Sequence, residues 1–218
     1  SKGQEREKQL LVDLLTTNET YFFREPFHFD FLTEQVLPAL RGRPARLWSA
    51  ACSSGEEVYT LAMVCAEGLG HGDWEVFGSD ISQRMLETAR AGVYPMDRAR
   101  AIPQEYLSRY CLKGVRGQAG KLLIDRALRD RVRFAPVNLT EPLREHTLYD
   151  VIFLRNVLIY FDNETKKEVV ERLAGVLRPG GYFFVSHVES LHGVTEVLRM
   201  VRPSIFRRPP AGAAPRAS

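Results

Sequence analysis

Residues 46–62, with the sequence RLWSAACSSGEEVYTLA, decide the fold of this chain. Residues 46–50 form a short apolar run, and the loop that follows contains only small residues before Gly55. Val58, Leu61 and Ala62 then recur at the spacing of one helix face. The stretch therefore predicts a strand, a tight loop and a helix, which is the repeating unit of a parallel sheet.

The same alternation continues along the chain. Ser82 can cap a second helix, and an amphipathic third helix is expected over residues 163–177, before the turn at 178–181. Further strands are expected at 74–79 (WEVFGS), 132–137, 150–154 (DVIFL) and 181–187 (GYFFVSH). Together these elements predict an α/β fold with a doubly wound, Rossmann-like sheet that carries helices on both faces.

Other segments depart from this alternation and suggest the domain limits. Residues 94–130 hold a short helix and two short strand-like runs, so we expect a small inserted β-subdomain there. Helices are also predicted over 4–16 and 27–40. The expected division is a leading helix at 1–16, the main domain at 17–206 including the insertion, and a flexible Pro/Ala-rich tail at 207–218.

Composition excludes several classes of protein. The 218 residues are 44% hydrophobic, which argues against a disordered chain, and no apolar run is long enough to insert into a membrane. Three cysteines without a CxxC pair and a charged start favour the cytoplasm. Five of the 30 basic residues lie from position 199 onward, leaving 25 basic and 27 acidic residues before them. The net charge of +3 therefore belongs to the tail and gives no reason to expect nucleic-acid binding.

The loops that follow the predicted strands indicate the ligand, because ligands bind at the carboxyl ends of the strands in such sheets. The loop before Gly55 lets a ligand approach the backbone, and Glu56 and Glu57 suit an amino group or a cation; alternatively they complement the helix dipole. Asp80 comes directly after a predicted strand, at a position where an acid commonly holds a ribose diol. Its alternative role is the N-cap of the next helix. A ribose acid without a pyrophosphate-binding glycine motif favours S-adenosylmethionine.

Six short segments, in order from about residue 15 to 206, resemble the chemotaxis receptor methyltransferases of the CheR type. They are TNETYFFR (17–24), RLWSAACSSGEEVYTLA, VFGSDIS with the following GVY, VNL, RNVLIYFD (155–162) and LRPGGYFFVSHVESL. The resemblance implies a class I S-adenosylmethionine-dependent methyltransferase domain. It also implies that S-adenosylmethionine donates a methyl group to glutamates on chemoreceptor cytoplasmic helices, leaving S-adenosylhomocysteine, and that the enzyme is a protein-glutamate O-methyltransferase.

The family's site residues can be placed on this sequence. Arg24 and Tyr160 resemble the residues at which the acceptor glutamate enters, although a surface ion pair for Arg24 and core packing for Tyr160 are alternatives. Glu56 matches the glutamate expected to meet the methionine amine, and Asp80 the ribose acid. The resemblance implies that the cofactor-binding residues are Asn18, Thr20, Arg24, Ala51, Gly55, Glu56, Asp80, Asn138, Leu139, Arg155 and Asn156, with no metal.

The sequence departs from the family pattern at two places. The late motif of the family reads SHVE at 186–189, and few residues precede position 17, where a receptor-docking helical domain usually stands. Basic residues of the inserted β-subdomain could bind a receptor C-terminal peptide or could simply be solvated. We expect a monomer. The alternative functions are a small-molecule methyltransferase and a non-catalytic S-adenosylmethionine-binding signalling module.

Overall fold

A seven-stranded sheet forms the centre of this computed structural model, which describes residues 20–143 and 147–211. The strand order is β6-β2-β1-β7-β8-β10-β9, and the first five strands run parallel to one another. β10 runs antiparallel to both of its neighbours. The strands span Ala45–Ala50 (β1), Trp74–Asp80 (β2), Val132–Pro136 (β6), Tyr149–Leu154 (β7), Leu177–Phe184 (β8), Arg199–Arg202 (β9) and Ile205–Arg207 (β10).

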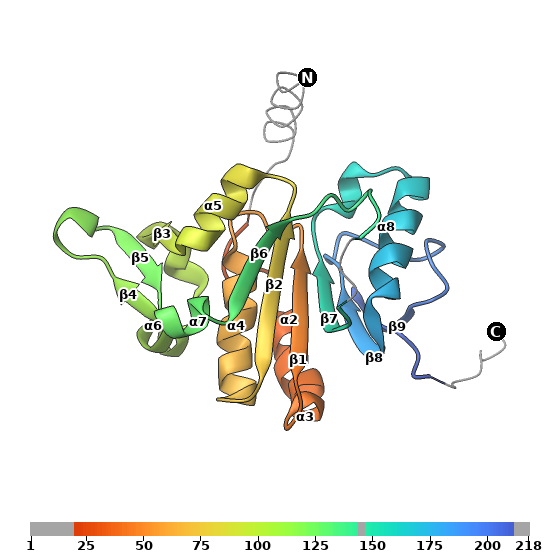
Figure 1. The fold of residues 1–218 in the computed structure, drawn as a ribbon, viewed down its shortest axis with the longest axis horizontal. Helices are drawn as coiled ribbons and strands as arrows, with labels where there is room; N and C mark the ends of the chain where they lie inside the picture. Colours follow the sequence, from red (N-terminus) through yellow and green to blue (C-terminus); the bar gives the residue numbers. More distant parts are fainter. Residues whose placement is uncertain (1–19, 144–146, 212–218) are drawn as a thin grey trace, which may run out of the picture.

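Helices cover both faces of this sheet, as Figure 1 shows. One apolar cluster joins α2 and α4 to the face that carries Leu47 and Phe153, and a second joins α8 to the face that carries Trp48 and Ile152. Neighbouring strand residues therefore pack on opposite faces, which explains why the central strands β1, β2 and β7 are mostly apolar and buried. The helices are α2 (Pro26–Phe31), α3 (Leu37–Leu40), α4 (Glu56–Leu69), α5 (Gln83–Ala91) and α8 (Asn163–Gly175). The doubly wound α/β prediction is confirmed.

The helix expected over 27–40 forms with an irregular centre. A π-helical turn, η1 (Leu32–Val36), separates α2 from α3, and Leu32 and Val36 point into the core. Pro38 follows this turn and has no N–H to donate to the preceding turn, so a regular α-helical hydrogen-bond pattern cannot continue there.

The insertion forms a second, three-stranded antiparallel sheet with the order β3-β5-β4, at one end of the molecule (Figure 1). Buried Tyr94 attaches it to the main domain by donating a hydrogen bond to the carbonyl of Ser54, at 2.7 Å. The β-subdomain comprises β3 (Val93–Pro95), η2 (Met96–Ala101), α6 (Gln104–Tyr110), β4 (Cys111–Lys113), η3 (Arg116–Gln118), β5 (Lys121–Ile124) and α7 (Arg126–Arg129).

The structure corrects the sequence prediction near the C-terminal side of the sheet. The strand predicted at 181–187 is β8, which begins at Leu177 and ends at Phe184, so the expected turn at Pro179 lies inside a strand. The β7–β8 register shifts there, from the pair Tyr149 and Leu177 to the pair Val151 and Tyr182, so Pro179 lies in an irregular stretch of the strand that tolerates a residue without an N–H. The hairpin of β9 and β10 was not predicted, because β9 is wholly exposed and shows no apolar alternation.

The leading helix predicted at 1–16 lies outside the described residues, as does most of the tail predicted at 207–218. Arg207 itself ends strand β10. Within residues 20–143 and 147–211, no helix is both long and apolar enough to cross a membrane.

Candidate functional site

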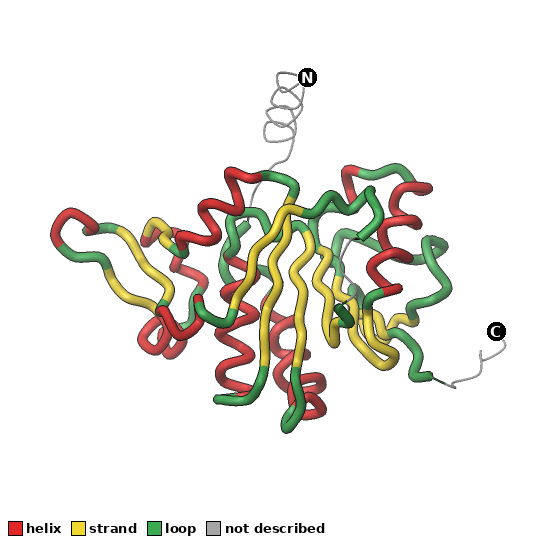
Figure 2. The backbone as a smooth tube through the Cα atoms, in the orientation of Figure 1, coloured by secondary structure: helices red, strands yellow, loops and turns green. Residues whose placement is uncertain are grey.

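A cavity of about 390 Å³ opens at the carboxyl ends of β1, β2, β6 and β7, where the loops in Figure 2 gather. The loops that follow these four strands and the segment at 20–24 contribute most of its wall. Its lining residues are Thr20, Tyr21, Arg24, Phe29, Ala51, Cys52, Ser53, Glu57, Asp80, Ile81, Val137, Asn138, Leu139, Thr140, Arg155, Asn156, Val157, Tyr160 and Phe161. The cavity therefore lies at the edge of the sheet where parallel α/β folds usually bind their ligands.

The loop after β1 has an unusual backbone. Ala51 and Ser53 both have positive φ, 65° and 49°, a conformation that non-glycine residues rarely adopt. Such strain often marks a ligand site, and both residues line the cavity. The main chain is held in this shape by a hydrogen bond from the Cys52 N–H to the Ser79 carbonyl, at 2.8 Å.

Gly55, whose contact with the cofactor stays a prediction, does not line the cavity. Its φ is 94°, and a Cβ at this position would lie 2.7 Å from the Cβ of Ala89 in α5. Glycine is therefore required here because the loop turns sharply and packs directly on α5.

Asp80 ends β2 at the cavity wall. One carboxylate oxygen accepts from the Ser53 N–H at 2.8 Å and the other from the Ser82 N–H at 2.9 Å. The N-cap of α5 is Ser82, whose hydroxyl accepts from Met85, so Asp80 does not serve as that cap. The carboxylate thus joins the loops after β1 and β2 and is held in a fixed orientation at the cavity wall.

The two adjacent glutamates of α4 point in different directions, because successive residues on a helix are about 100° apart. Glu57 lines the cavity, where it accepts from the Ser49 hydroxyl at 2.7 Å and pairs with Arg155 at 3.1 Å. Burial raises the pKa of the Glu57 carboxyl above its usual value, and the nearby Arg155 charge offsets this only in part. A carboxylate in this place can receive an amino group or another cation.

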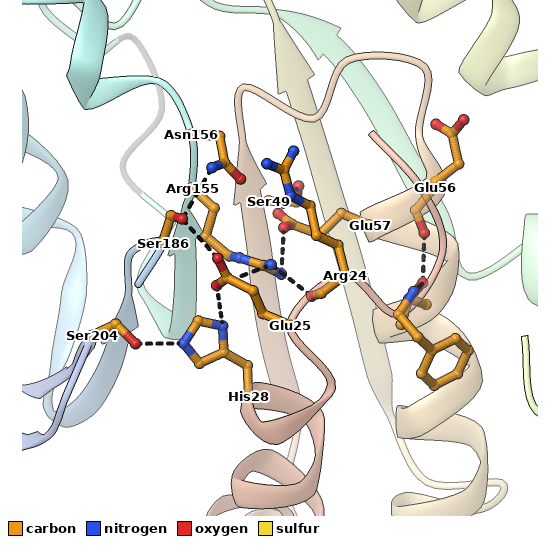
Figure 3. A network of polar contacts seen from close by, with 12 residues as sticks. Arg24, Glu25, His28, Ser49, Glu56, Glu57, Arg155, Asn156, Ser186 and Ser204 are labelled. Carbon is orange, nitrogen blue, oxygen red and sulfur yellow. Dashed lines mark hydrogen bonds and ion pairs between the residues drawn. The ribbon is translucent and has the colours of Figure 1, made fainter. Parts of the chain in front are cut away.

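Glu56 does not line the cavity, and Figure 3 shows its side chain pointing away from Glu57 and Arg155. Its contact with the methionine amine stays a prediction. Its buried carboxylate accepts from the Ser54 hydroxyl at 2.6 Å and pairs with Arg98 of the β-subdomain at 2.9 Å. Arg98 also donates to the Thr20 carbonyl at 2.9 Å, so this ion pair connects the β-subdomain to the segment above the cavity.

Arg155 is a buried residue of the cavity wall. Its guanidinium donates to the Arg24 carbonyl at 2.6 Å and pairs with Glu25 at 3.2 Å as well as with Glu57 (Figure 3). Arg24 lies on the neighbouring segment, with its guanidinium 5.7 Å from the ring centre of Tyr21. These contacts of the Arg155 guanidinium therefore fix the main chain that carries Arg24.

The loop after β6 contributes Asn138 and Leu139. The Asn138 side-chain oxygen accepts from the N–H and hydroxyl of Thr140, at 3.1 and 2.8 Å, and its amide group donates to Glu141 at 3.1 Å. These contacts hold the loop in an Asx-type turn at the cavity.

The loop after β7 completes the site. Asn156 has a positive φ of 59° and lines the cavity. The short 3-10 helix η4 (Leu158–Tyr160) follows and places Tyr160, 44% exposed, at the rim. The structure thus brings Thr20, Arg24, Ala51, Asp80, Asn138, Leu139, Arg155, Asn156 and Tyr160 of the predicted residues to one cavity, whereas Asn18 lies outside the described residues.

Sequence reasoning missed several of the polar residues behind the cavity wall. Glu25, His28, Ser186 and Ser204 form a connected network with Arg155 (Figure 3). His28 is fully buried, and this burial together with the Arg155 charge lowers its pKa to about 3. No local spacing in the sequence connects the members of this network, so the sequence did not predict it.

The site has the features that S-adenosylmethionine requires. Its wall carries two carboxylates, Glu57 and Asp80, and a backbone that ligand atoms can approach closely, without a glycine-rich phosphate loop. Among the described residues, no group of three His, Cys, Asp or Glu side chains is arranged to hold a metal ion. Together, the strand order and this cavity define the class I S-adenosylmethionine-dependent methyltransferases.

Comparison with known proteins places the chain more narrowly. Residues 18–206 match the family described as CheR methyltransferase, SAM binding domain. Chemotaxis protein methyltransferase 2 of Pseudomonas aeruginosa is 40% identical over 206 residues, covering 92% of this chain and 73% of that protein. The chemotaxis protein methyltransferases of Escherichia coli and Salmonella typhimurium are 40% and 39% identical, covering 84% and 92% of this chain and 65% and 70% of those proteins.

This chain therefore belongs to the CheR methyltransferase family, and S-adenosylmethionine is its methyl donor. It spans between 65% and 73% of the length of these three relatives.

Proposed function

We propose that this chain transfers the methyl group of S-adenosylmethionine to glutamate side chains on the cytoplasmic helices of chemoreceptors. The product is a glutamate methyl ester, which removes one negative charge from the receptor helix. The names of the relatives support the chemotaxis context. The observation that carries the proposal is the cavity rim, where Arg24 and the exposed Tyr160 offer a guanidinium and a phenol to an entering carboxylate.

The cavity residues would divide the cofactor between them. Glu57 would hold the amino group of the methionine part, and Asp80 the ribose hydroxyls, since carboxylates are the strong acceptors for both groups. Asn138 and Leu139, on the loop after β6, would contact the adenine. Arg155 lines the cavity, but its guanidinium is already engaged by Glu57, Glu25 and the Arg24 carbonyl, so its main role would be to position these groups.

The reaction needs no general base from the protein. An acceptor glutamate has a pKa of about 4.3, so it is already an anionic nucleophile at neutral pH. Bound S-adenosylmethionine supplies an electrophilic methyl group: a bond forms from the carboxylate oxygen to this methyl, and the C–S bonding electrons leave with sulfur. Arg24 and Tyr160 would orient the acceptor oxygen, because positioning is the main contribution an enzyme can make to such a step.

A methyl-transfer assay tests this proposal. The chain is incubated with S-adenosylmethionine carrying a radiolabelled methyl group and a purified receptor cytoplasmic fragment. The expected result is labelled receptor that releases methanol in base, and much less label when the acceptor glutamates are replaced by glutamine. Tight cofactor binding without base-labile receptor label would overturn the proposal. Label in a metabolite would then indicate a small-molecule methyltransferase, and no transfer at all would indicate a binding module.

We also propose that the β-subdomain binds a peptide at the C-terminus of the receptor. β4 is an edge strand of the small sheet, with exposed Leu112 beside Lys113 and exposed Val115 beyond it. An extended peptide can add to such an edge as a further strand, and lysine favours an acidic one. Fluorescence anisotropy with a labelled tail peptide should show binding that Leu112→Asp weakens at least tenfold. Equal binding to both proteins would remove this surface from the proposal.

The cytoplasmic location and the monomeric state stay predictions. Fractionation of cells that express the chain and sedimentation of the purified protein would test them.

A further inference from the structure

The carboxylate of Glu189 accepts three main-chain hydrogen bonds on the loops beside the cavity. One oxygen accepts from the N–H groups of Asn156 and Ser186, at 3.0 and 2.9 Å, and the other accepts from the Leu158 N–H at 2.9 Å. Glu189 is only 8% exposed and does not line the cavity. It therefore binds loops of the protein rather than the ligand.

Two of these N–H groups belong to the segment that carries the site residues of the loop after β7. Asn156 lies in the strained, positive-φ conformation at the cavity wall, and Leu158 begins the η4 turn that ends at Tyr160. The turn closes by a hydrogen bond from the Tyr160 N–H to the Val157 carbonyl, at 3.2 Å. The sheet ladder ends at Leu154, so Glu189 supplies the acceptors that the next strand no longer provides.

Ser186 connects this arrangement to Glu25, the residue after Arg24. Its hydroxyl accepts from the Asn156 amide at 3.0 Å and lies 2.7 Å from a Glu25 oxygen, to which it donates (Figure 3). Asn156 is thus held through its main chain by Glu189 and through its side chain by Ser186. Neither contact is available to a loop that has moved away from β8.

We propose that Glu189 is a positioning residue for methyl transfer, which holds the turn presenting Tyr160 at the cavity rim. The inference rests on the proposed role of Tyr160 toward the acceptor. A carboxylate is needed at this position because three donors converge on its two oxygens. Glutamine would offer one oxygen and would place its own N–H groups against a main-chain donor.

A double-mutant cycle tests the inference on the full chain with the receptor fragment as acceptor. The variants are Glu189→Gln, Tyr160→Phe and the two combined, with Glu196→Gln as an exposed control from the same region of the chain. We expect Glu189→Gln and Tyr160→Phe each to lower kcat/KM for the acceptor roughly 10- to 100-fold. The combined variant should be no slower than Tyr160→Phe, because Glu189 acts through Tyr160. Glu196→Gln should match the wild type.

Other outcomes overturn the inference. Losses that multiply in the combined variant would show that Glu189 acts independently of Tyr160, and an unchanged rate in either single variant would have the same effect. Thermal unfolding shows whether Glu189→Gln folds; if it does not, the cycle is repeated with Glu189→Asp, which keeps the charge but shortens the reach. Failure of both variants to fold would assign Glu189 to general stability. Absence of transfer by the wild type would instead overturn the proposed function.

Discussion

Replacing Glu57 by glutamine should separate the amino-acid end of the cofactor site from its nucleoside end. The Glu57 carboxylate lies on the cavity between the Ser49 hydroxyl at 2.7 Å and the Arg155 guanidinium at 3.1 Å. If it also holds the cofactor's amino group, the substitution removes one charged hydrogen bond to that group. Such a bond contributes about 1.5–3 kcal/mol, so the dissociation constant should rise roughly 10- to 150-fold.

The assay is titration calorimetry with two ligands, S-adenosylhomocysteine and methylthioadenosine. Methylthioadenosine has the same nucleoside but lacks the amino-acid group, so its affinity should change less than about threefold in Glu57→Gln. Glu56→Gln is the matched control, because Glu56 is adjacent on α4 but pairs with Arg98 outside the cavity. Its affinity for S-adenosylhomocysteine should stay within about threefold of the wild type.

Stability must be measured alongside affinity. The Arg155 guanidinium keeps Glu25 and the Arg24 carbonyl in Glu57→Gln, so the variant loses one charged hydrogen bond inside the protein. Because burial already disfavours the charged form of Glu57, the free energy of unfolding should fall by less than about 3 kcal/mol, and the protein should remain folded. Equal weakening of both ligands by Glu57→Gln, or a larger effect of Glu56→Gln, would refute the reasoning.

Three further predictions concern the rest of the site. Asp80→Asn should weaken both ligands roughly tenfold or more in the same titrations, since it alters the ribose end; selective loss of S-adenosylhomocysteine would contradict this. Gly55→Ala should lower the free energy of unfolding by about 1–3 kcal/mol in urea, because its Cβ would lie 2.7 Å from Ala89; an unchanged midpoint would disprove the packing argument. His28 has a folded-state pKa of about 3 against 6.5 unfolded, so the unfolded chain binds more protons between these values. Acidification from pH 6.5 should therefore remove about 1.4 kcal/mol of stability per pH unit from this group, and His28→Gln should show a shallower loss in urea titrations at several pH values.

Local sequence patterns predicted most of the fold and most of the cavity. Periodicity identified the parallel strands, and the polar residues after them, such as Asp80 and Asn156, reached the same cavity as expected. The carboxyl ends of parallel strands meet at one edge, so a residue's place after its strand is enough to position it. The same reasoning failed for β9, which is short and fully exposed, and for the start of β8, where the register shifts around Pro179.

Adjacent residues show the limit of this reasoning most clearly. Glu56 and Glu57 have the same side chain and the same local sequence, but only the rotation of α4 against β1 decides which one faces the cavity. Gly55 likewise looks like a glycine that lets a ligand approach, but the structure requires glycine there because α5 packs directly on the loop.

By itself, the sequence determined the layers, the strand–loop–helix units and the chemical types available at the site, because these depend on residues close together in the chain. Tertiary structure alone decided which side chains meet. Glu189 contacts Asn156 from 33 positions away, and Glu25 contacts Ser186 from 161 positions away. No periodicity spans such separations, so the network that holds the site arises only when strands distant in sequence become neighbours in the sheet.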